Sequence, residues 1–140
     1  MKPISYECSK FLLYKCDHTL SQQFSGQDVI YRCKRSGYME GQLYVTSEVF
    51  IAKTTTYKLS DKSIYLFLCK YYGVKKLECE MTCDIKLCDI LMAKQFGVKE
   101  FTPILSVQQR YFAQGGLVSI VNTYVNTGIQ KYTFENSTIG

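Results

Sequence analysis

The chain has a single histidine, His18, and this scarcity limits the kinds of enzyme that the sequence could encode. A serine or cysteine nucleophile usually takes its base from a histidine, so a catalytic triad could be built only around His18. His18 follows Asp17 in a polar stretch, and the chain has neither a G-x-S-x-G motif nor a glycine-framed catalytic cysteine. We therefore expect His18 to be an exposed loop residue and the protein not to be an enzyme.

Long apolar runs are also missing. The longest uninterrupted ones, such as Ile64–Cys69, are far shorter than the roughly 20 residues that a transmembrane helix needs. The first ten residues mix charged and apolar side chains, which does not fit the apolar region of a secretory signal. These absences predict an intracellular, cytoplasmic protein that is neither secreted nor transmembrane.

The motifs of common cofactor sites are absent as well. The sequence contains no P-loop, dinucleotide-binding fingerprint, EF-hand loop or H-E-x-x-H motif. Glu78 and Glu80 are paired acids, but carboxylates at this spacing more commonly belong to a solvated strand face than to an acid-base site. We therefore predict no cofactor and no small-molecule substrate.

Seven cysteines are many for 140 residues, yet an odd number without a secretory signal argues against a disulfide framework. A zinc site is the alternative, and its candidate ligands are Cys79, Cys83, Cys88, Cys69 and the Cys16–His18 pair. Cys79 and Cys83 would lie roughly 13 Å apart in an extended strand, too far to share one tetrahedral ion. We expect reduced cysteines that pack in the core, and no bound metal.

The clearest periodic signal is the stretch Leu77–Ile85, in which every second residue is apolar. This alternation is typical of a half-buried strand. The preceding run, Ile64–Tyr72, is almost continuously apolar and predicts a strand buried on both faces. We expect the two strands to form a central hairpin in which Met81 lies in the core.

Two short helices are predicted. An apolar stripe that ends at Gly97 indicates one helix around residues 86–96. Thr102-Pro103 is a favourable helix start, because threonine caps free amides and proline fits the first turn, so a second helix is expected over residues 103–114. Asp17–Asp28 is expected to be a loop.

Most of the remaining chain reads as strands, since it is rich in tyrosine, phenylalanine and β-branched residues. The expected strands are one or two in residues 1–16, one from Val29 to Lys34, one over Leu43–Leu59 with a bend near Ala52, and a hairpin of Leu117–Val125 with Ile129–Phe134. The sequence thus predicts an α+β fold, a mainly antiparallel β-sheet of about seven or eight strands with two short helices, in a single domain of residues 1–140.

Positive charge is concentrated in the first half of the chain. Residues 1–76 hold twelve Lys or Arg and six Asp or Glu, whereas residues 77–140 hold five and six. Within residues 29–76 the basic side chains alternate with tyrosines, a combination that suits phosphate contacts and base stacking. The candidate binding residues are Arg32, Lys34, Arg35, Lys53, Lys58, Lys70, Tyr71, Tyr72, Lys75 and Lys76.

The leading hypothesis is a non-enzymatic binding and assembly protein, of the kind found among viral accessory and structural proteins, that engages RNA or another anionic surface through this basic region. The alternative is a self-associating structural or matrix-like protein that contacts anionic membrane. An enzyme or a zinc-binding module with an unrecognised site comes third. A homo-oligomer is expected under both of the first two hypotheses.

Overall fold

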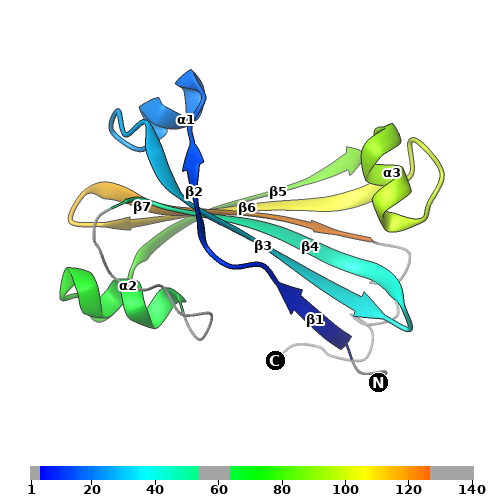
Figure 1. The fold of residues 1–140 in the computed structure, drawn as a ribbon, viewed down its shortest axis with the longest axis horizontal. Coiled ribbons are helices and arrows are strands. Elements are labelled where there is room, and N and C mark those ends of the chain that lie inside the picture. Colours follow the sequence, from blue (N-terminus) through cyan, green and yellow to red (C-terminus); the bar gives the residue numbers. More distant parts are fainter. Residues whose placement is uncertain (1–3, 54–63, 127–140) are drawn as a thin grey trace.

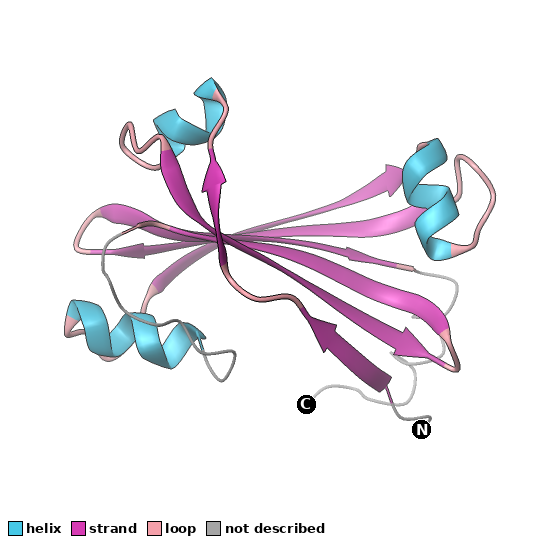
Figure 2. Cartoon of the chain, viewed as in Figure 1, coloured by secondary structure: helices cyan, strands magenta, loops and turns pink. Residues whose placement is uncertain are grey.

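The computed structural model describes residues 4–53 and 64–126 of the chain, which form a seven-stranded antiparallel sheet with three helices (Figures 1 and 2). The elements in chain order are β1 (Ile4–Cys8), β2 (Leu12–Lys15), α1 (His18–Gln23), β3 (Val29–Met39), β4 (Gln42–Ile51), α2 (Ile64–Tyr72), β5 (Glu78–Leu87), α3 (Ile90–Phe96), β6 (Pro103–Ala113) and β7 (Gly116–Val125). The predicted α+β class with a mainly antiparallel sheet is confirmed. That residues 1–140 form a single domain stays a prediction.

The centre of the sheet is built from two long hairpins. The strand order is β1-β3-β4-β7-β6-β5, and β2 also pairs with β3. The turns of the two hairpins are Glu40-Gly41 between β3 and β4 and Gln114-Gly115 between β6 and β7, and all four residues have positive φ angles. Two-residue turns of this kind match the right-handed twist of the strands that they join. The pairing of β4 with β7 then unites the hairpins in one sheet.

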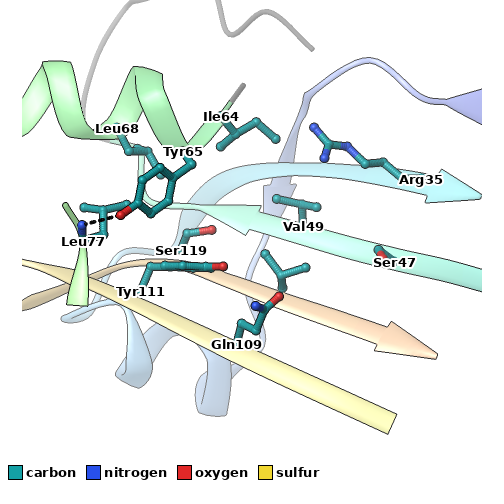
Figure 3. Close-up of a pocket in the computed structure, with 11 residues that line it drawn as sticks. Arg35, Ser47, Val49, Ile64, Tyr65, Leu68, Leu77, Gln109, Tyr111 and Ser119 are labelled. Carbon is teal, nitrogen blue, oxygen red and sulfur yellow. Dashed lines mark hydrogen bonds between the residues drawn. The ribbon is translucent and has the colours of Figure 1, made fainter. Parts of the chain in front are cut away.

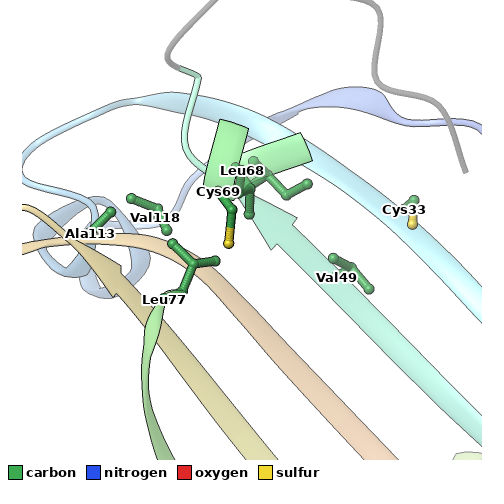
Figure 4. Close-up of a cluster of buried hydrophobic side chains, with 8 residues drawn as sticks. Cys33, Val49, Leu68, Cys69, Leu77, Ala113 and Val118 are labelled. Atoms are coloured by element: carbon green, nitrogen blue, oxygen red, sulfur yellow. The ribbon is translucent and has the colours of Figure 1, made fainter. Parts of the chain in front are cut away.

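Opposite faces of the sheet carry different helices. Val49 and Ile51 of β4 belong to a buried cluster with the α2 residue Leu68 (Figure 4). Phe50, which lies between them, packs instead with Phe24, the residue that caps α1 at its C-terminus. Because successive residues of a strand point to opposite faces, α1 and α2 lie on opposite faces of the sheet, and α3 lies at the other end of the strands (Figure 1).

The prediction of a buried strand over Ile64–Tyr72 is wrong, because this segment is helix α2. Leu68 and Cys69 are buried, whereas Leu66 is 66% exposed, so the apolar run covers the sheet with one side only. A short apolar run fits a buried strand and a one-sided helix equally well, and its periodicity cannot separate them.

The predicted central hairpin of these segments is therefore also wrong. β5 forms as expected, but it is the edge strand of the sheet, and all of its residues are exposed. Met81, which was expected in the core, is 59% exposed. The alternation in β5 correctly predicts a strand, yet it does not say whether anything covers the apolar face.

The helix prediction for residues 103–114 is wrong, and the one for residues 86–96 is confirmed over part of its range. β6 occupies Pro103–Ala113 and pairs on both sides, with β5 and with β7. These two ladders override the local helix-start signal, and proline is tolerated as the first residue of a strand. Helix α3 is capped by the Asp89 side chain, which accepts a hydrogen bond from the Met92 amide, and by Gly97 at φ 68°.

The expected loop Asp17–Asp28 contains helix α1, with Asp17 as its N-cap. The hairpin partner expected at Ile129–Phe134 lies outside the described residues. In the part of the chain that the structure describes, none of the helices has the length and apolar character needed to cross a membrane.

Candidate functional site

A cavity of about 280 Å³ lies between helix α2 and the sheet (Figure 3). Its walls come from α2 and the residue that follows the next loop, and from the face of strands β3, β4, β6 and β7 that α2 covers. The lining residues are Arg35, Ser47, Val49, Ile64, Tyr65, Leu68, Leu77, Gln109, Tyr111, Ser119 and Val121.

One end of the cavity is aromatic and apolar. The rings of Tyr65 and Tyr111 meet edge to face with their centroids 6.0 Å apart, and Leu68 and Leu77 lie beside them (Figure 3). The Tyr65 hydroxyl accepts a hydrogen bond of 3.1 Å from the Leu77 amide, which ties α2 to the start of β5. This end can therefore hold an apolar or aromatic group in a fixed position.

The phenol of Tyr111 stays neutral over a wider pH range than an exposed tyrosine. Its pKa is raised above the ordinary value, first by burial and then by the neighbouring Cys79, with which it also hydrogen-bonds. Both effects disfavour the phenolate. At neutral pH the Tyr111 hydroxyl is thus a hydrogen-bonding group and carries no charge.

The other end of the cavity is polar, and Arg35 is the cation that the described residues place there. Arg35 and Ser47 pair across β3 and β4, and Gln109 of β6 lies on the same face (Figure 3). Ser47 shares a hydrogen bond of 2.9 Å with Thr123. Among the described residues, the half-buried Arg35 guanidinium has no ion pair, and the lining of the cavity includes no carboxylate. Such a cation favours an anionic group.

The cavity also opens toward the N-terminal strand. A second hollow is lined by Tyr6, Glu7 and Cys8 of β1, and it shares Arg35 and Ser47 with the first. Arg35 therefore stands where the two hollows meet, and it is accessible from the β1 side.

The structure places the first three predicted binding residues on two different faces. Arg32 donates a hydrogen bond of 2.7 Å from Nε to Glu48, and its guanidinium lies 5.3 Å from the centre of the Tyr14 ring. Lys34 is exposed and pairs in register with Glu48, on the same face as Arg32. Arg35 is the member of the predicted set that lies in the cavity.

The other predicted binding residues lie on or near α2 where the structure describes them. Lys70 and Tyr71 are exposed on the helix, and Lys75 and Lys76 are exposed in the loop that follows it. The rings of Tyr71 and Tyr72 contact each other edge to face, with 4.8 Å between their centroids. Lys53 is exposed just after β4, and Lys58 lies outside the described residues.

The cysteines singled out for zinc lie apart in the structure. Cys79 and Cys83 are exposed along β5, whereas Cys88 is buried in the cluster beneath α3. Within residues 4–53 and 64–126, no group of three histidine, cysteine or acidic side chains is placed to hold a metal ion.

Sequence reasoning missed most of the cavity. Ser47 and Gln109 are polar residues in phase with apolar ones, Ser47 with Val49 and Gln109 with Val107. Polar residues on the covered face of a strand are a signal for a lined cavity, because a buried polar group needs a partner. To recognise these residues as part of one cavity, one must know which strands pair with each other, and the sequence alone did not show this.

No family model matches the sequence, and no curated protein matches it at the sequence level. Its fold is similar to that of several solved bacterial proteins. A GntR-family transcriptional regulator from Bacillus cereus superposes with a TM-score of 0.75 and 10% identity, over 89% of this chain and 92% of that one. The ligand-binding domain assigned to a GntR-family regulator from Bordetella bronchiseptica gives 0.68 and 12%, over 89% and 83%.

A third similar structure is longer than this chain. YydK from Bacillus subtilis, described as a possible transcriptional regulator, gives a TM-score of 0.71 and 16% identity over 89% of this chain. The chain spans 58% of the length of that structure. At these identities the likeness establishes a shared fold.

The hypothesis of an RNA-binding or membrane-associated viral protein is wrong. The three similar structures named above come from bacteria and are described as transcriptional regulators or, in one case, as the ligand-binding domain of such a regulator. The prediction that the partner is RNA or an anionic membrane, and that no small molecule binds, is wrong for the same reason. Charge and tyrosine counts suggested a continuous basic strip, whereas Arg32 is paired on one face and Arg35 lines a small-molecule-sized cavity on the other. The chain therefore has the fold of GntR-type regulator domains, with a cavity between α2 and the sheet.

Proposed function

We propose that this chain is a cytoplasmic, non-enzymatic sensor domain that binds a small molecule in the cavity between α2 and the sheet. The observation that carries the proposal is the combination of an aromatic end with the Arg35 guanidinium, which has no ion pair among residues 4–53 and 64–126, in a single cavity. The shared fold with a ligand-binding domain of a GntR-family regulator supports the same assignment. In that setting, the bound molecule would control transcription.

The chemistry of the walls defines the ligand class as a small anion with an apolar body. Arg35 would take a carboxylate or phosphate, and Ser47 and Gln109 would hydrogen-bond to the same polar group. Tyr65 and Tyr111 would contact the apolar part. The volume of about 280 Å³ lies near the lower end of the roughly 300–1,000 Å³ that ligand pockets span, so the ligand is small.

The polar groups of the cavity favour binding over catalysis. Two serines line it, but the Ser119 hydroxyl donates a 2.8 Å hydrogen bond to the Phe50 carbonyl, and Ser47 is engaged with Thr123. A serine nucleophile needs a neighbouring base. The only histidine of the chain, His18, begins α1 on the opposite face of the sheet.

Ligand binding would fasten α2 to the sheet. The helix contributes Ile64, Tyr65 and Leu68 to the cavity, and the strands contribute the remaining wall. A ligand that contacts both sides binds only the form in which α2 is docked, and it stabilises that form by mass action. The position of α2 is thus the element through which the proposed sensor would report occupancy.

Thermal unfolding in the presence of phenylacetate, hexanoate and hexyl phosphate tests the proposal. At least one of these probes should raise the melting temperature in a concentration-dependent manner. Arg35→Gln should abolish the rise, whereas Lys34→Gln should leave it unchanged, because Lys34 is the adjacent cation on the opposite face. Stabilisation that is equal in both variants would show that the anion binds elsewhere, and no stabilisation by any probe would reject this ligand class.

A further inference from the structure

The second hollow, which has a volume of about 440 Å³, extends the candidate cavity toward β1. Arg35 and Ser47 line both spaces and pair in register across β3 and β4 (Figure 3). The aromatic end of the cavity lies on one side of this pair, and the second hollow continues on the other. A molecule held at Arg35 and Ser47 can therefore extend in two directions over the sheet.

The floor of the second hollow is a glycine. Gly37 is buried in β3, two residues beyond Arg35 and therefore on the same face. It pairs in register with Tyr6 of β1 on one side and with the half-buried Val45 of β4 on the other. A glycine within a strand lacks a side chain to fill the surface, and such positions often mark a site where a ligand approaches the backbone closely.

An exposed aromatic ring forms one wall of the second hollow. Tyr6 is 69% exposed, although it stands opposite a glycine. Cys8, which pairs with Arg35, is also exposed and lines the same space. Glu7 and Ser36 pair with each other out of phase with these residues, so their side chains point toward the opposite face. The second hollow thus offers an aromatic surface against which a flat ring can pack.

We propose that the ligand is a phosphodiester whose anionic group binds at Arg35 and Ser47 and whose two arms occupy the two hollows; this inference rests on the proposed function. A phosphodiester carries its charge between two substituents, whereas a terminal carboxylate or phosphate leaves one hollow empty. Its two free oxygens match the parallel N–H donors of a guanidinium. One arm contacts Tyr65 and Tyr111, and the other contacts Tyr6.

The charge of the site also favours a diester over a phosphate monoester. Arg35 is the cation that the described residues contribute to the two hollows. A phosphate monoester carries about −1.5 to −2 charges at pH 7, so one guanidinium leaves part of this charge unbalanced in a half-buried site. A diester carries a single negative charge, which one guanidinium balances.

Calorimetric titration with three benzyl phosphates tests the two arms. Benzyl phosphate has one arm, benzyl methyl phosphate is a diester with a minimal second arm, and dibenzyl phosphate has two rings. The wild type should bind dibenzyl phosphate at least about tenfold more tightly than benzyl methyl phosphate, because only the former fills the second hollow. It should bind benzyl phosphate no more tightly than benzyl methyl phosphate.

Two substitutions locate the second ring. Tyr6→Ala removes the aromatic wall and Val45→Phe fills the hollow, so each should abolish the preference for dibenzyl phosphate over benzyl methyl phosphate. Leu12→Ala is the matched control, because Leu12 of β2 is 67% exposed and lines neither hollow. The preference should persist in this control. Circular dichroism melts of each variant separate loss of binding from loss of folding.

The Cys8 thiol reports occupancy of the second hollow in the unsubstituted chain. Iodoacetamide alkylates a thiolate with loss of iodide, and mass spectrometry gives the rate at each cysteine. At about ten times its dissociation constant, dibenzyl phosphate leaves about a tenth of the sites free and should slow Cys8 alkylation about tenfold. Benzyl methyl phosphate should leave the Cys8 rate unchanged. Cys83, which is exposed on the distant strand β5, is the internal reference.

The possible failures distinguish this inference from the proposed function. Equal affinities of the two diesters for the wild type, a preference that survives Tyr6→Ala and Val45→Phe, or equal Cys8 rates with both diesters would overturn the two-armed ligand. So would binding of phenylacetate without binding of any benzyl phosphate. Each of these results leaves the sensor with a single occupied cavity. If phenylacetate, hexanoate and hexyl phosphate also fail to bind, the proposed function falls as well.

Discussion

Leu68→Ala is the substitution that tests the docking of α2 on the sheet. Leu68 is 1% exposed, belongs to the cluster with Val49 and Ile51, and also borders the cavity. Truncating a buried leucine removes its transfer free energy and leaves a void, with a usual cost of about 2–5 kcal/mol. Here the new void would join the existing cavity, so the surrounding side chains gain little by collapsing into it.

Urea unfolding monitored by circular dichroism would measure this cost. With a slope of about 1–3 kcal/mol per molar urea, the midpoint should fall by roughly 1–2 M. Met81→Lys is the matched control, because Met81 is 59% exposed on the sheet edge and the change should cost less than about 0.5 kcal/mol. If Met81→Lys proved as costly as Leu68→Ala, the placement of α2 over the core and of β5 at the edge would be refuted.

Three further substitutions probe single contacts. Asp89→Ala removes the N-cap of α3, whose carboxylate accepts from the Met92 amide at 2.8 Å, and should cost about 1 kcal/mol in thermal unfolding, with little change for Glu78→Ala, which alters an exposed carboxylate of β5. Tyr65→Phe removes the hydrogen bond from the Leu77 amide and should cost about 0.5–1.5 kcal/mol; an unchanged stability would mean that water replaces the hydroxyl. The pKa of Tyr111 is raised in the folded chain, so its contribution to stability is complete below its ordinary pKa of 10.0 and is lost as the pH rises through the folded value. Phenolate absorbance should therefore show one tyrosine titrating late, and Tyr111→Phe should remove it and flatten the alkaline loss of stability.

Sequence patterns predicted the strands well where the apolar residues alternate and where turn residues are distinctive. β5 and β7 were expected close to their observed bounds, and α3 was expected before Gly97, which adopts the left-handed conformation of a helix C-cap. These signals are local, because they depend on backbone geometry and on the side chains of one segment.

The errors arose where contacts distant in sequence decide the structure. α2 and β6 each carry a pattern compatible with a helix and with a strand, and the sheet selects one. β5 shows an apolar face that nothing in the described residues covers, so alternation alone placed Met81 in the core incorrectly. The candidate site was hidden for the same reason. Arg35 was noticed for its charge, but its proximity to Tyr111 requires the pairing order of four strands.

The most direct test of the central claim is a calorimetric comparison of a carboxylate with its primary amide. Either phenylacetate or hexanoate, whichever stabilises the chain more, would be titrated alongside its amide into the wild type and into Arg35→Gln. A charge-assisted hydrogen bond contributes about 1.5–3 kcal/mol, so the wild type should bind the carboxylate roughly 10–100-fold more tightly than the amide. Arg35→Gln should bind both with the same weak affinity. If Arg35→Gln still preferred the carboxylate by the wild-type factor, Arg35 would not be the anion-binding group and the cavity between α2 and the sheet would not be the sensor site.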